Sequence, residues 1–358
     1  MRELGLALGS IPGIEPWFLL NRDLPVPPET SERFRSVGEV AYADERGLPG
    51  DAVYHVPSPL EPSSLARIWP RRLRSNPLVV TLHDLIPAVF PKENMPDTGV
   101  RRAYWARLEL ARHADRVLNV SQATARDATR LLGLRPERMA VTGGGVSDDF
   151  KPPASPDAAR MALRELRPSF ESEYVLFTGG MDYRKNTSGL LDAYAGLPKD
   201  LRDRFTLVVV GRLGADDPFG SIPEHAEALG ISDRLLLTGH VSDEELIVLY
   251  QASSLFVFPS LYEGFGLPVV EAFACGAPAI VGRNSSLVEL VDEEEALFDS
   301  SDPASIRAAL GRALTDENLR ERLRRPDVRE RFTWPRIAEL TADAYRLVAT
   351  KRAEATIH

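Results

Sequence analysis

Short apolar runs rich in β-forming residues alternate with longer helical patterns along most of this chain, and this alternation limits the fold more than any other sequence feature. Runs such as 78–84 (LVVTLHD) and 205–211 (FTLVVVG) are typical of buried strands in a sheet covered by helices. The alternation predicts α/β domains with parallel sheets. Further strands are predicted at 16–21, 52–56, 116–121, 139–145, 174–180, 234–241, 254–260 and 277–282.

A proline-rich stretch, 150–160 (FKPPASPDAAR), separates two such sets of strands and helices, which is typical of a domain boundary. The chain has 358 residues, enough for two domains. We therefore predict domains at 1–155 and 156–335, followed by a closing helix at 336–358. The first 13 residues have a helical pattern without a preceding strand, whereas open α/β sheets usually start with a strand. Either the first domain starts on a helix, or its first strand is absent from this sequence.

Charge is distributed unevenly between the two halves of the chain. Residues 1–155 hold 20 Lys and Arg against 19 Asp and Glu (+1), and the remainder holds 23 against 33 (−10), which together give the net charge of −9. An acidic second half argues against nucleic-acid binding, which needs a basic surface. Basic clusters at 71–74 and 101–112 are either a solvated face or a surface for acidic lipid or acceptor, through which the first domain would touch a membrane peripherally.

The single cysteine, Cys275, excludes an internal disulfide and any site with several cysteine ligands. Its surroundings, AFACGAP, favour a small buried residue over a nucleophile. No apolar run reaches the length of a membrane span, and the N-terminus lacks a signal-peptide pattern. A cytoplasmic location follows as the default prediction.

The segment 258–281 (FPSLYEGFGLPVVEAFACGAPAIV) joins a predicted strand to a helix through a glycine-rich loop. Pro268 suits the first helical position, and Gly264 and Gly266 allow a ligand to approach the backbone. Backbone amides at a helix start bind anions such as a diphosphate. The loop follows the carboxyl end of a strand, where open α/β sheets bind ligands.

Two glutamates flank this loop. Glu271 is expected in the first helical turn, where its carboxylate can accept hydrogen bonds from two vicinal hydroxyls, as in a ribose. Glu263, at the strand end, would face a group beyond the diphosphate, and with a sugar there it would offset positive charge at the anomeric carbon. The same residues are equally compatible with a helix-start acid and a solvated loop acid, because G-x-G loops are common.

Other predicted strand ends carry polar or flexible residues. The run FTGGMDYRKN ends in Gly179 and Gly180 and then supplies Arg184 and Lys185, cations that suit a diphosphate or an exposed turn.

The later run LTGHVSDEEL places His240 and Val241 at another strand end, where backbone groups can meet a nucleotide base. In the first half, a buried strand ends on His83 and Asp84, where an acceptor would meet the donor.

At these motifs the sequence resembles the retaining glycosyltransferase family 4, in its mannosyltransferase-like branch. The segment with Glu263 and Glu271 resembles the family's E-x7-E donor signature. Flanking segments agree in order: VVTLHDLIP, ADRVLNVSQATARD, GGGVSDDFKP, GGMDYRKN, GHVSDEEL and RNSSLVELV. The resemblance covers the chain from about the strand at 52–56 to the end.

The resemblance implies the GT-B fold: two Rossmann-like, doubly wound α/β domains that face a central cleft, with a C-terminal helix crossing back. It implies an enzyme that moves a hexose, mannose-like, from a nucleotide-diphosphate sugar to a hydroxyl of a glycan, lipid-linked or natural-product acceptor, with retention. GDP-mannose is the favoured donor, and neither a metal nor a further cofactor is needed.

The family's motifs also imply roles for single residues. Glu263 would contact the donor sugar, Glu271 the ribose, and Lys185, with Arg184 as a weaker candidate, the leaving diphosphate. His83 would lie at the acceptor side of the transferred sugar, with Asp84 beside it. The remaining donor-binding positions are Gly179, Gly180, His240, Val241, Gly264, Phe265, Gly266 and Leu267, of which the last three would present backbone amides to the diphosphate.

Two departures from the family pattern keep alternatives open. Many members have an arginine where this chain has Gly180, and the family's first strand and glycine-rich acceptor loop have no counterpart here. A nucleotide-sugar-binding subunit without full activity is therefore one alternative. A GT-B nucleotide-sugar epimerase is another, although it would need acid and base groups on both faces of the sugar.

Overall fold

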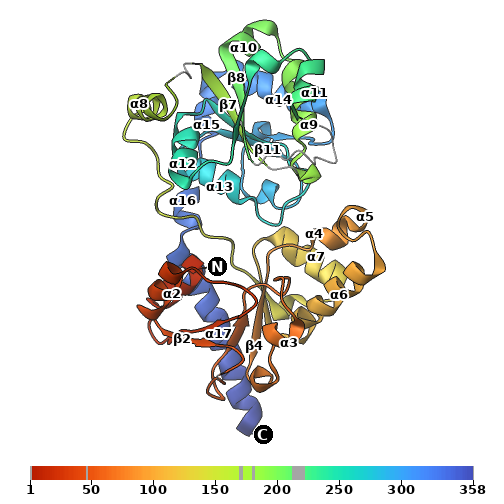
Figure 1. The fold of residues 1–358 in the computed structure, drawn as a ribbon, viewed down its shortest axis with the longest axis vertical. Helices are drawn as coiled ribbons and strands as arrows, with labels where there is room; N and C mark the ends of the chain where they lie inside the picture. The colour runs from red at the N-terminus through yellow and green to blue at the C-terminus, as the bar shows by residue number, and fades with distance from the viewer. Residues whose placement is uncertain (1, 46, 169–171, 180–181, 212–221, 358) are drawn as a thin grey trace. The chain divides into compact units, whose positions relative to one another are not determined.

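The computed structural model describes residues 2–45, 47–168, 172–179, 182–211 and 222–357, and the chain divides into two compact units (Figure 1). The N-terminal unit consists of Met1–Ser147 and Phe332–His358, and the C-terminal unit of Asp148–Arg331. In the structure, the boundaries between the two units follow residues 147 and 331. The sequence analysis predicted these boundaries after residues 155 and 335. The proline-rich stretch leads directly into a helix that starts at Pro156, so residues 148–155 group with the C-terminal unit.

The C-terminal unit contains one parallel sheet in the order β12-β11-β10-β7-β8-β9. The chain builds β7, β8 and β9 outward in one direction and then returns to place β10 on the other side of β7. This reversal is the topological switch point of a doubly wound sheet. The strands are β7 (Glu173–Thr178), β8 (Phe205–Val210), β9 (Leu235–Gly239), β10 (Leu255–Phe258), β11 (Ala279–Gly282) and β12 (Leu297–Phe298).

Helices cover both faces of this sheet, with α9 and α14 packed together on one side and α12 and α13 on the other (Figure 1). The four side chains of β10, LFVF, are all fully buried, and each contributes about 2 kcal/mol through burial. The helices are α8 (Pro156–Leu166), α9 (Thr187–Ala195), α10 (Lys199–Arg204), α11 (Ile222–Ala228), α12 (Asp243–Ala252), α13 (Leu267–Ala274), α14 (Pro303–Thr315), α15 (Glu317–Arg322) and α16 (Val328–Arg331).

In the N-terminal unit, the described strands form a four-stranded parallel sheet, β3-β4-β5-β6, and a separate two-stranded parallel sheet, β1-β2. The strands are β1 (Trp17–Leu20), β2 (Glu39–Tyr42), β3 (Tyr54–Val56), β4 (Leu78–Leu82), β5 (Arg116–Asn119) and β6 (Met139–Val141). The helix predicted at the N-terminus is α1 (Arg2–Leu8), and it is followed by β1.

Alternate residues of β4 and β5 face two different helical layers. Val80 and Val117 belong to one cluster with side chains of α6 and α7, whereas Val79 and Leu118 pack with side chains of α17. This alternation explains why β4 is apolar throughout. The helices are α1, α2 (Pro28–Arg35), α3 (Leu65–Ile68), α4 (Ile86–Val89), α5 (Pro91–Asn94), α6 (Thr98–His113), α7 (Gln122–Leu132) and α17 (Trp334–Ile357).

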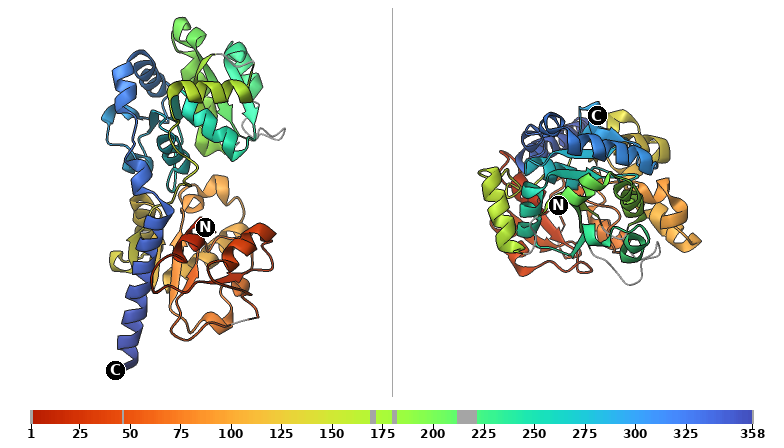
Figure 2. Two further views of the ribbon diagram at one scale, coloured as in Figure 1. Left: turned by 90° about the vertical axis from the view of Figure 1, so that its left-hand side faces the viewer. Right: turned by 90° about the horizontal axis from the view of Figure 1, so that it is seen from above.

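The last helix, α17, belongs to the N-terminal unit although it ends the chain, as the predicted crossing-back helix requires. It packs against α1 through Ile337, Ala338 and Ala342, and Figure 2 shows it as the long helix that carries the C-terminus.

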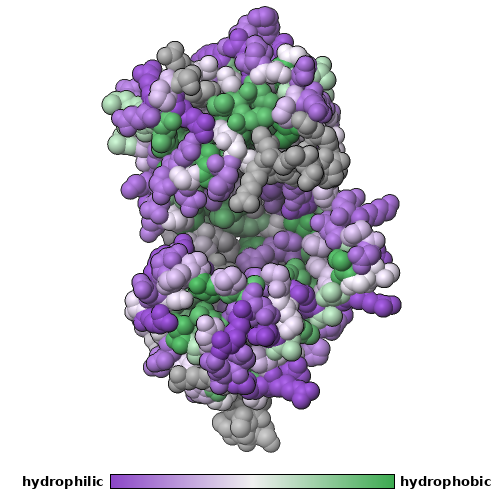
Figure 3. All heavy atoms as spheres, in the orientation of Figure 1, coloured by the Kyte–Doolittle hydropathy of each residue, from purple (hydrophilic) through white to green (hydrophobic). Residues whose placement is uncertain are grey.

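Two strands, β2 and β12, were not among those predicted from the sequence. The strand β2 has only intermediate or exposed residues, so it lacks the apolar run that signals a buried strand. Hydrophilic side chains cover much of each unit's visible surface (Figure 3). Among the described residues, none of the helices has both the length and the apolarity of a membrane span.

Candidate functional site

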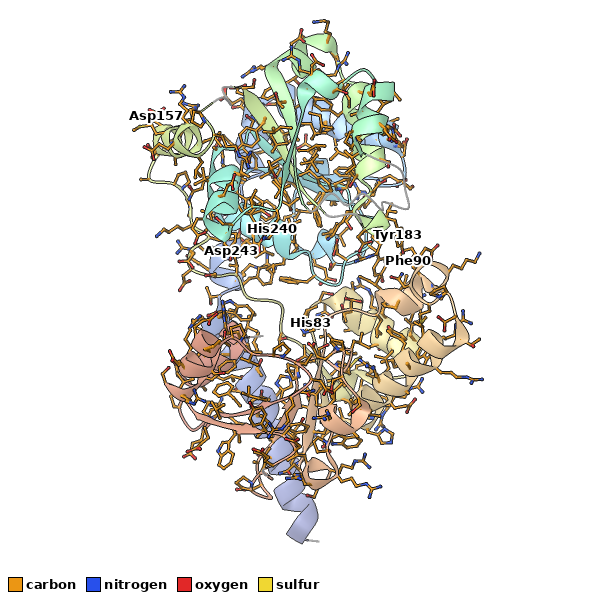
Figure 4. All side chains as sticks on the ribbon, viewed as in Figure 1. His83, Phe90, Asp157, Tyr183, His240 and Asp243 are labelled. Carbon is orange, nitrogen blue, oxygen red and sulfur yellow. The ribbon has the colours of Figure 1, made fainter. Side chains whose placement is uncertain are left out.

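The candidate site lies at the switch point of the C-terminal sheet. Because β10 pairs with β7 in parallel, the loops after these two strands are neighbours at the carboxyl end of the sheet, which we call the sheet edge below. The loop after β7 leads to a short 3-10 helix, Tyr183–Lys185, and the loop after β10 holds Glu263. Figure 4 shows Tyr183 and His240 at this same end of the C-terminal unit.

Lys185 and Glu263 form an ion pair at this edge, with 2.6 Å between the lysine Nζ and Oε1 of the glutamate. Their side chains are only 18% and 11% exposed. The ammonium also lies 4.8 Å from the centre of the Phe258 ring, a cation–π distance. The structure therefore brings together two of the predicted catalytic residues, 78 positions apart in the chain.

A polar network holds the loop of Glu263 in place. Ser260 donates a hydrogen bond to Oε1 of Glu263 (2.7 Å), the Glu263 amide donates to Oγ of Ser285 (2.9 Å), and Ser286 donates to the Glu263 carbonyl (3.0 Å). Asn284 and Ser300 both donate to the Ser260 carbonyl. Sequence reasoning missed these residues as positioning groups. For Asn284, Ser285 and Ser286, the signal that could have found them is the polar cluster RNSS directly after a buried strand.

Arg184 makes mainly internal contacts. Its guanidinium pairs with the Asp182 carboxylate and donates to the Tyr262 carbonyl (3.3 Å), while its own carbonyl accepts from Leu261 and Ser260. Arg184 thus ties the loop after β7 to the loop after β10.

The helix α13 starts where the glycine-rich loop ends. Gly266 is its N-cap with φ of 98°, a left-handed conformation that favours glycine, and an added Cβ would lie 2.8 Å from Leu287 Cδ2. Pro268 is the second residue of the helix, one position later than the sequence predicted. Because Leu267 is the first helical residue, its amide has no acceptor within the helix. The loop thereby presents backbone to the same sheet edge as Lys185.

Glu271 does not lie in the first turn of α13, which contains no acidic residue. The prediction of a first-turn position was wrong because the helix starts at Leu267, which makes Glu271 its fifth residue. Its Oε2 accepts a hydrogen bond from the Tyr250 hydroxyl (3.2 Å). Burial raises the pKa of Glu271 to about 7, against the lowering effect of that hydrogen bond.

This raised pKa predicts a pH-dependent cost of folding. As the pH rises from 4.5, the ordinary pKa of glutamate, to about 7, the free energy of unfolding falls, because Glu271 ionises in the unfolded chain but stays protonated in the folded chain. Glu271→Gln keeps an acceptor for Tyr250 but removes the charge. We expect the variant to match the parent near pH 4.5 and to exceed it at pH 8 by up to about 3 kcal/mol, measured by urea unfolding. A difference between the two proteins that does not change with pH would contradict this prediction.

The remaining predicted donor positions follow neighbouring strands. Gly179 comes directly after β7, where an added Cβ would lie 2.2 Å from the Phe177 ring. Gly180 lies outside the described residues. His240 is exposed and Val241 buried after β9, and Gly264 is buried while Phe265 is partly buried.

His83 and Asp84 lie at the carboxyl end of β4 in the N-terminal unit (Figure 4). Nε2 of His83 lies 2.9 Å from the Pro57 carbonyl, so this nitrogen carries the ring proton. His83 is exposed at this strand end, but the protein around its ring partly desolvates the imidazole, and this desolvation lowers its pKa, which favours the neutral form. Asp84 accepts a hydrogen bond from the Ile86 amide and so shapes the turn.

Cys275 is fully buried, and burial, followed by the nearby Glu271, raises the pKa of its thiol to about 12. The sequence-based view of Cys275 as a packing residue is therefore confirmed. Across the described ranges, His, Cys, Asp and Glu side chains form no group of three or more suited to a metal ion.

Comparison with known families and structures defines the class of the protein. Residues 163–326 match the family model of glycosyl transferases group 1, and residues 24–150 match that of Glycosyltransferase Family 4. Sucrose-phosphate synthase from Thermosynechococcus elongatus has a similar structure, with a TM-score of 0.71 and 25% sequence identity over 98% of this chain and 92% of that one. The chain is a glycosyltransferase with the GT-B fold.

Among curated relatives, the O-antigen chain mannosyltransferase B of Escherichia coli is 33% identical over 301 residues, 83% of this chain and 75% of the relative. This chain belongs to glycosyltransferase family 4. The serotype-specific mannosyltransferase WbdA of Escherichia coli is 31% identical over 272 residues, 75% of this chain. The matched region covers 33% of the length of WbdA.

Proposed function

We propose that this chain transfers a hexose, with retention, from a nucleotide-diphosphate sugar to a hydroxyl of a glycan, lipid-linked or small-molecule acceptor. The Lys185–Glu263 pair at the switch point of the C-terminal sheet carries this proposal. Open α/β sheets bind ligands at this point, and there the lysine suits the diphosphate of the donor while the glutamate suits its sugar. The mannosyltransferase names of the relatives support mannose as the sugar and GDP-mannose as the donor.

In this proposal the donor diphosphate replaces Glu263 as the partner of Lys185. Backbone amides at the start of α13 bind the same phosphates, and the lysine offsets the negative charge that grows on the leaving diphosphate. The glycosidic bond to the diphosphate breaks as the acceptor oxygen bonds to the anomeric carbon from the same face. The leaving phosphate takes the acceptor proton, which balances the step.

Glu263 then stabilises positive charge at the anomeric carbon. Glu271 accepts hydrogen bonds from the ribose hydroxyls. These donors favour its ionised form, which burial alone disfavours. For His83 and Asp84 we propose the acceptor side of the reaction, on the basis of the family motif. A peripheral contact with a membrane remains a prediction from the sequence.

The first test is the thermal stability of the purified chain with GDP, UDP, dTDP or ADP. A nucleotide at about 100 times its Kd should stabilise the fold by about 2.7 kcal/mol, and we expect this shift with GDP. Stabilisation by another nucleotide alone would overturn GDP-mannose as the donor. The absence of any shift from folded protein would contradict a formed donor site.

Product analysis separates the proposed activity from its alternatives. With donor and acceptor, a retaining transferase gives a glycoside with the anomeric configuration of the donor, which proton NMR identifies. An epimerase would convert the donor sugar without acceptor, and a binding subunit would give a thermal shift without either product.

A further inference from the structure

The N-terminal unit contains a cavity of about 570 Å³ that plays no part in the proposed transfer. It is lined by the ends of β1 and β2, by α3 and by the 3-10 helix Arg71–Leu73 with its neighbours. Its volume lies within the range of small-molecule sites. Five arginines and one acidic residue line it: Arg22, Arg67, Arg71, Arg72, Arg74 and Asp44.

The acidic side chains around this cavity are already shared by two of the arginines. Arg22 pairs with Asp44 (3.2 Å) and with Glu45. Arg67 pairs with Asp23 (3.2 Å) and, at 3.8 Å, with the same Asp44. Five guanidinium groups thus meet three carboxylates, and the excess positive charge lies with the arginines of the 71–74 segment.

The arginines of this segment are exposed, and none of them pairs with an acidic side chain in the part of the chain that the structure describes. Within the described residues, Arg71 and Arg72 make no ion pair, and the Arg74 guanidinium lies 5.1 Å from the centre of the Trp69 ring. Like charges so close together repel each other, and a bound anion would relieve that repulsion.

We propose that this cavity binds a phosphate group, carried either by a soluble phosphate ester or by a lipid headgroup. Arginine suits this ligand because its planar guanidinium donates two parallel hydrogen bonds to phosphate oxygens. Arg71 and Arg72 provide donors without an ion pair among the described residues, and Arg22 and Arg67, held by their carboxylates, line the same cavity. The cavity lies wholly within the N-terminal unit and is separate from the Lys185–Glu263 pair.

The test compares the parent chain with Arg71→Gln/Arg72→Gln. A matched control, Arg35→Gln/Arg135→Gln, removes two exposed arginines of the same unit that lie outside both basic clusters. All four positions are exposed, so both variants should fold, which circular dichroism verifies. Inorganic pyrophosphate is the soluble probe, titrated by calorimetry. Vesicles of phosphatidylcholine, with or without phosphatidylglycerol, are the lipid probe, assayed by sedimentation.

We expect the Arg71/Arg72 variant to lose affinity for the phosphate probe by about tenfold or more, while the control retains it. A loss with pyrophosphate identifies a site for soluble phosphate. A loss confined to vesicles with phosphatidylglycerol identifies a headgroup site. Pyrophosphate is also expected to bind at the site of Lys185. The test therefore compares the affinity of the Arg71/Arg72 variant with that of the control variant, because both keep the Lys185 site. Equal binding by all three proteins to both probes would overturn the proposal.

Discussion

Replacing Glu263 with glutamine is expected to slow donor turnover by roughly 100- to 1000-fold and to leave nucleotide affinity nearly unchanged. The amide keeps the size of the side chain and an oxygen that accepts from Ser260 and Lys185. It removes the negative charge that would stabilise the anomeric carbon. The effect should therefore appear in kcat, because that charge develops only in the transition state.

The measurement is steady-state release of nucleoside diphosphate, together with calorimetric titration of the nucleotide that stabilises the parent chain. Glu165→Gln is the matched control, because Glu165 is an exposed residue of α8 in the same unit. Unchanged kcat in Glu263→Gln would remove Glu263 from the reaction. An equal loss of nucleotide affinity would instead point to a collapsed loop.

Replacing Lys185 with methionine is expected to weaken nucleoside diphosphate binding by roughly 10- to 100-fold and to lower turnover as well. The substitution keeps much of the length of the side chain but removes the only charge that pairs with Glu263 among the described residues. Affinity for the nucleoside without phosphates should not change, since Lys185 is proposed to contact only the diphosphate. Parallel titrations with the two ligands measure this selectivity.

Two further variants distinguish a role in binding from a role in folding. Lys199→Met, at a side chain 80% exposed on α10, should behave like the parent. Lys185→Met leaves the Glu263 carboxylate only 11% exposed and without its cation, which costs stability. Adding Glu263→Gln to Lys185→Met should restore stability but neither diphosphate affinity nor turnover. Recovery of diphosphate affinity in the double variant would show that Lys185 serves the fold alone.

The apolar patterns located most strands of the structure. The predicted run at 205–211 contains β8 (Phe205–Val210), and the run at 254–260 contains β10 (Leu255–Phe258). Patterns of this kind are local, because burial on both faces leaves a direct trace in a strand's own residues. The strand β2 left no such trace, and the position of Glu271 was misjudged because a helix start varies by a few residues.

Glu263, Lys185 and the glycine-rich loop were predicted as site residues from the sequence because strand ends of α/β sheets carry polar and glycine residues. Their motifs also identified the family, which the comparisons confirm. The supporting groups Ser285, Ser286 and Ser300 were not found. Ser285 and Ser286 belong to the polar cluster RNSS, a local signal that pointed to them, whereas Ser300 is distinguished only by its contact with the Ser260 carbonyl.

The sequence by itself determined the kind of sheet, the residues that end its strands and the family to which the chain belongs. Each of these depends on residues close together in the chain. Only the tertiary structure decided that Lys185 pairs with Glu263, 78 positions away, and that α17, which was predicted to cross back, docks on α1. The order of strands in a sheet and the docking of a terminal helix are set by surfaces that meet only after the chain has folded, and no local pattern encodes which surfaces meet.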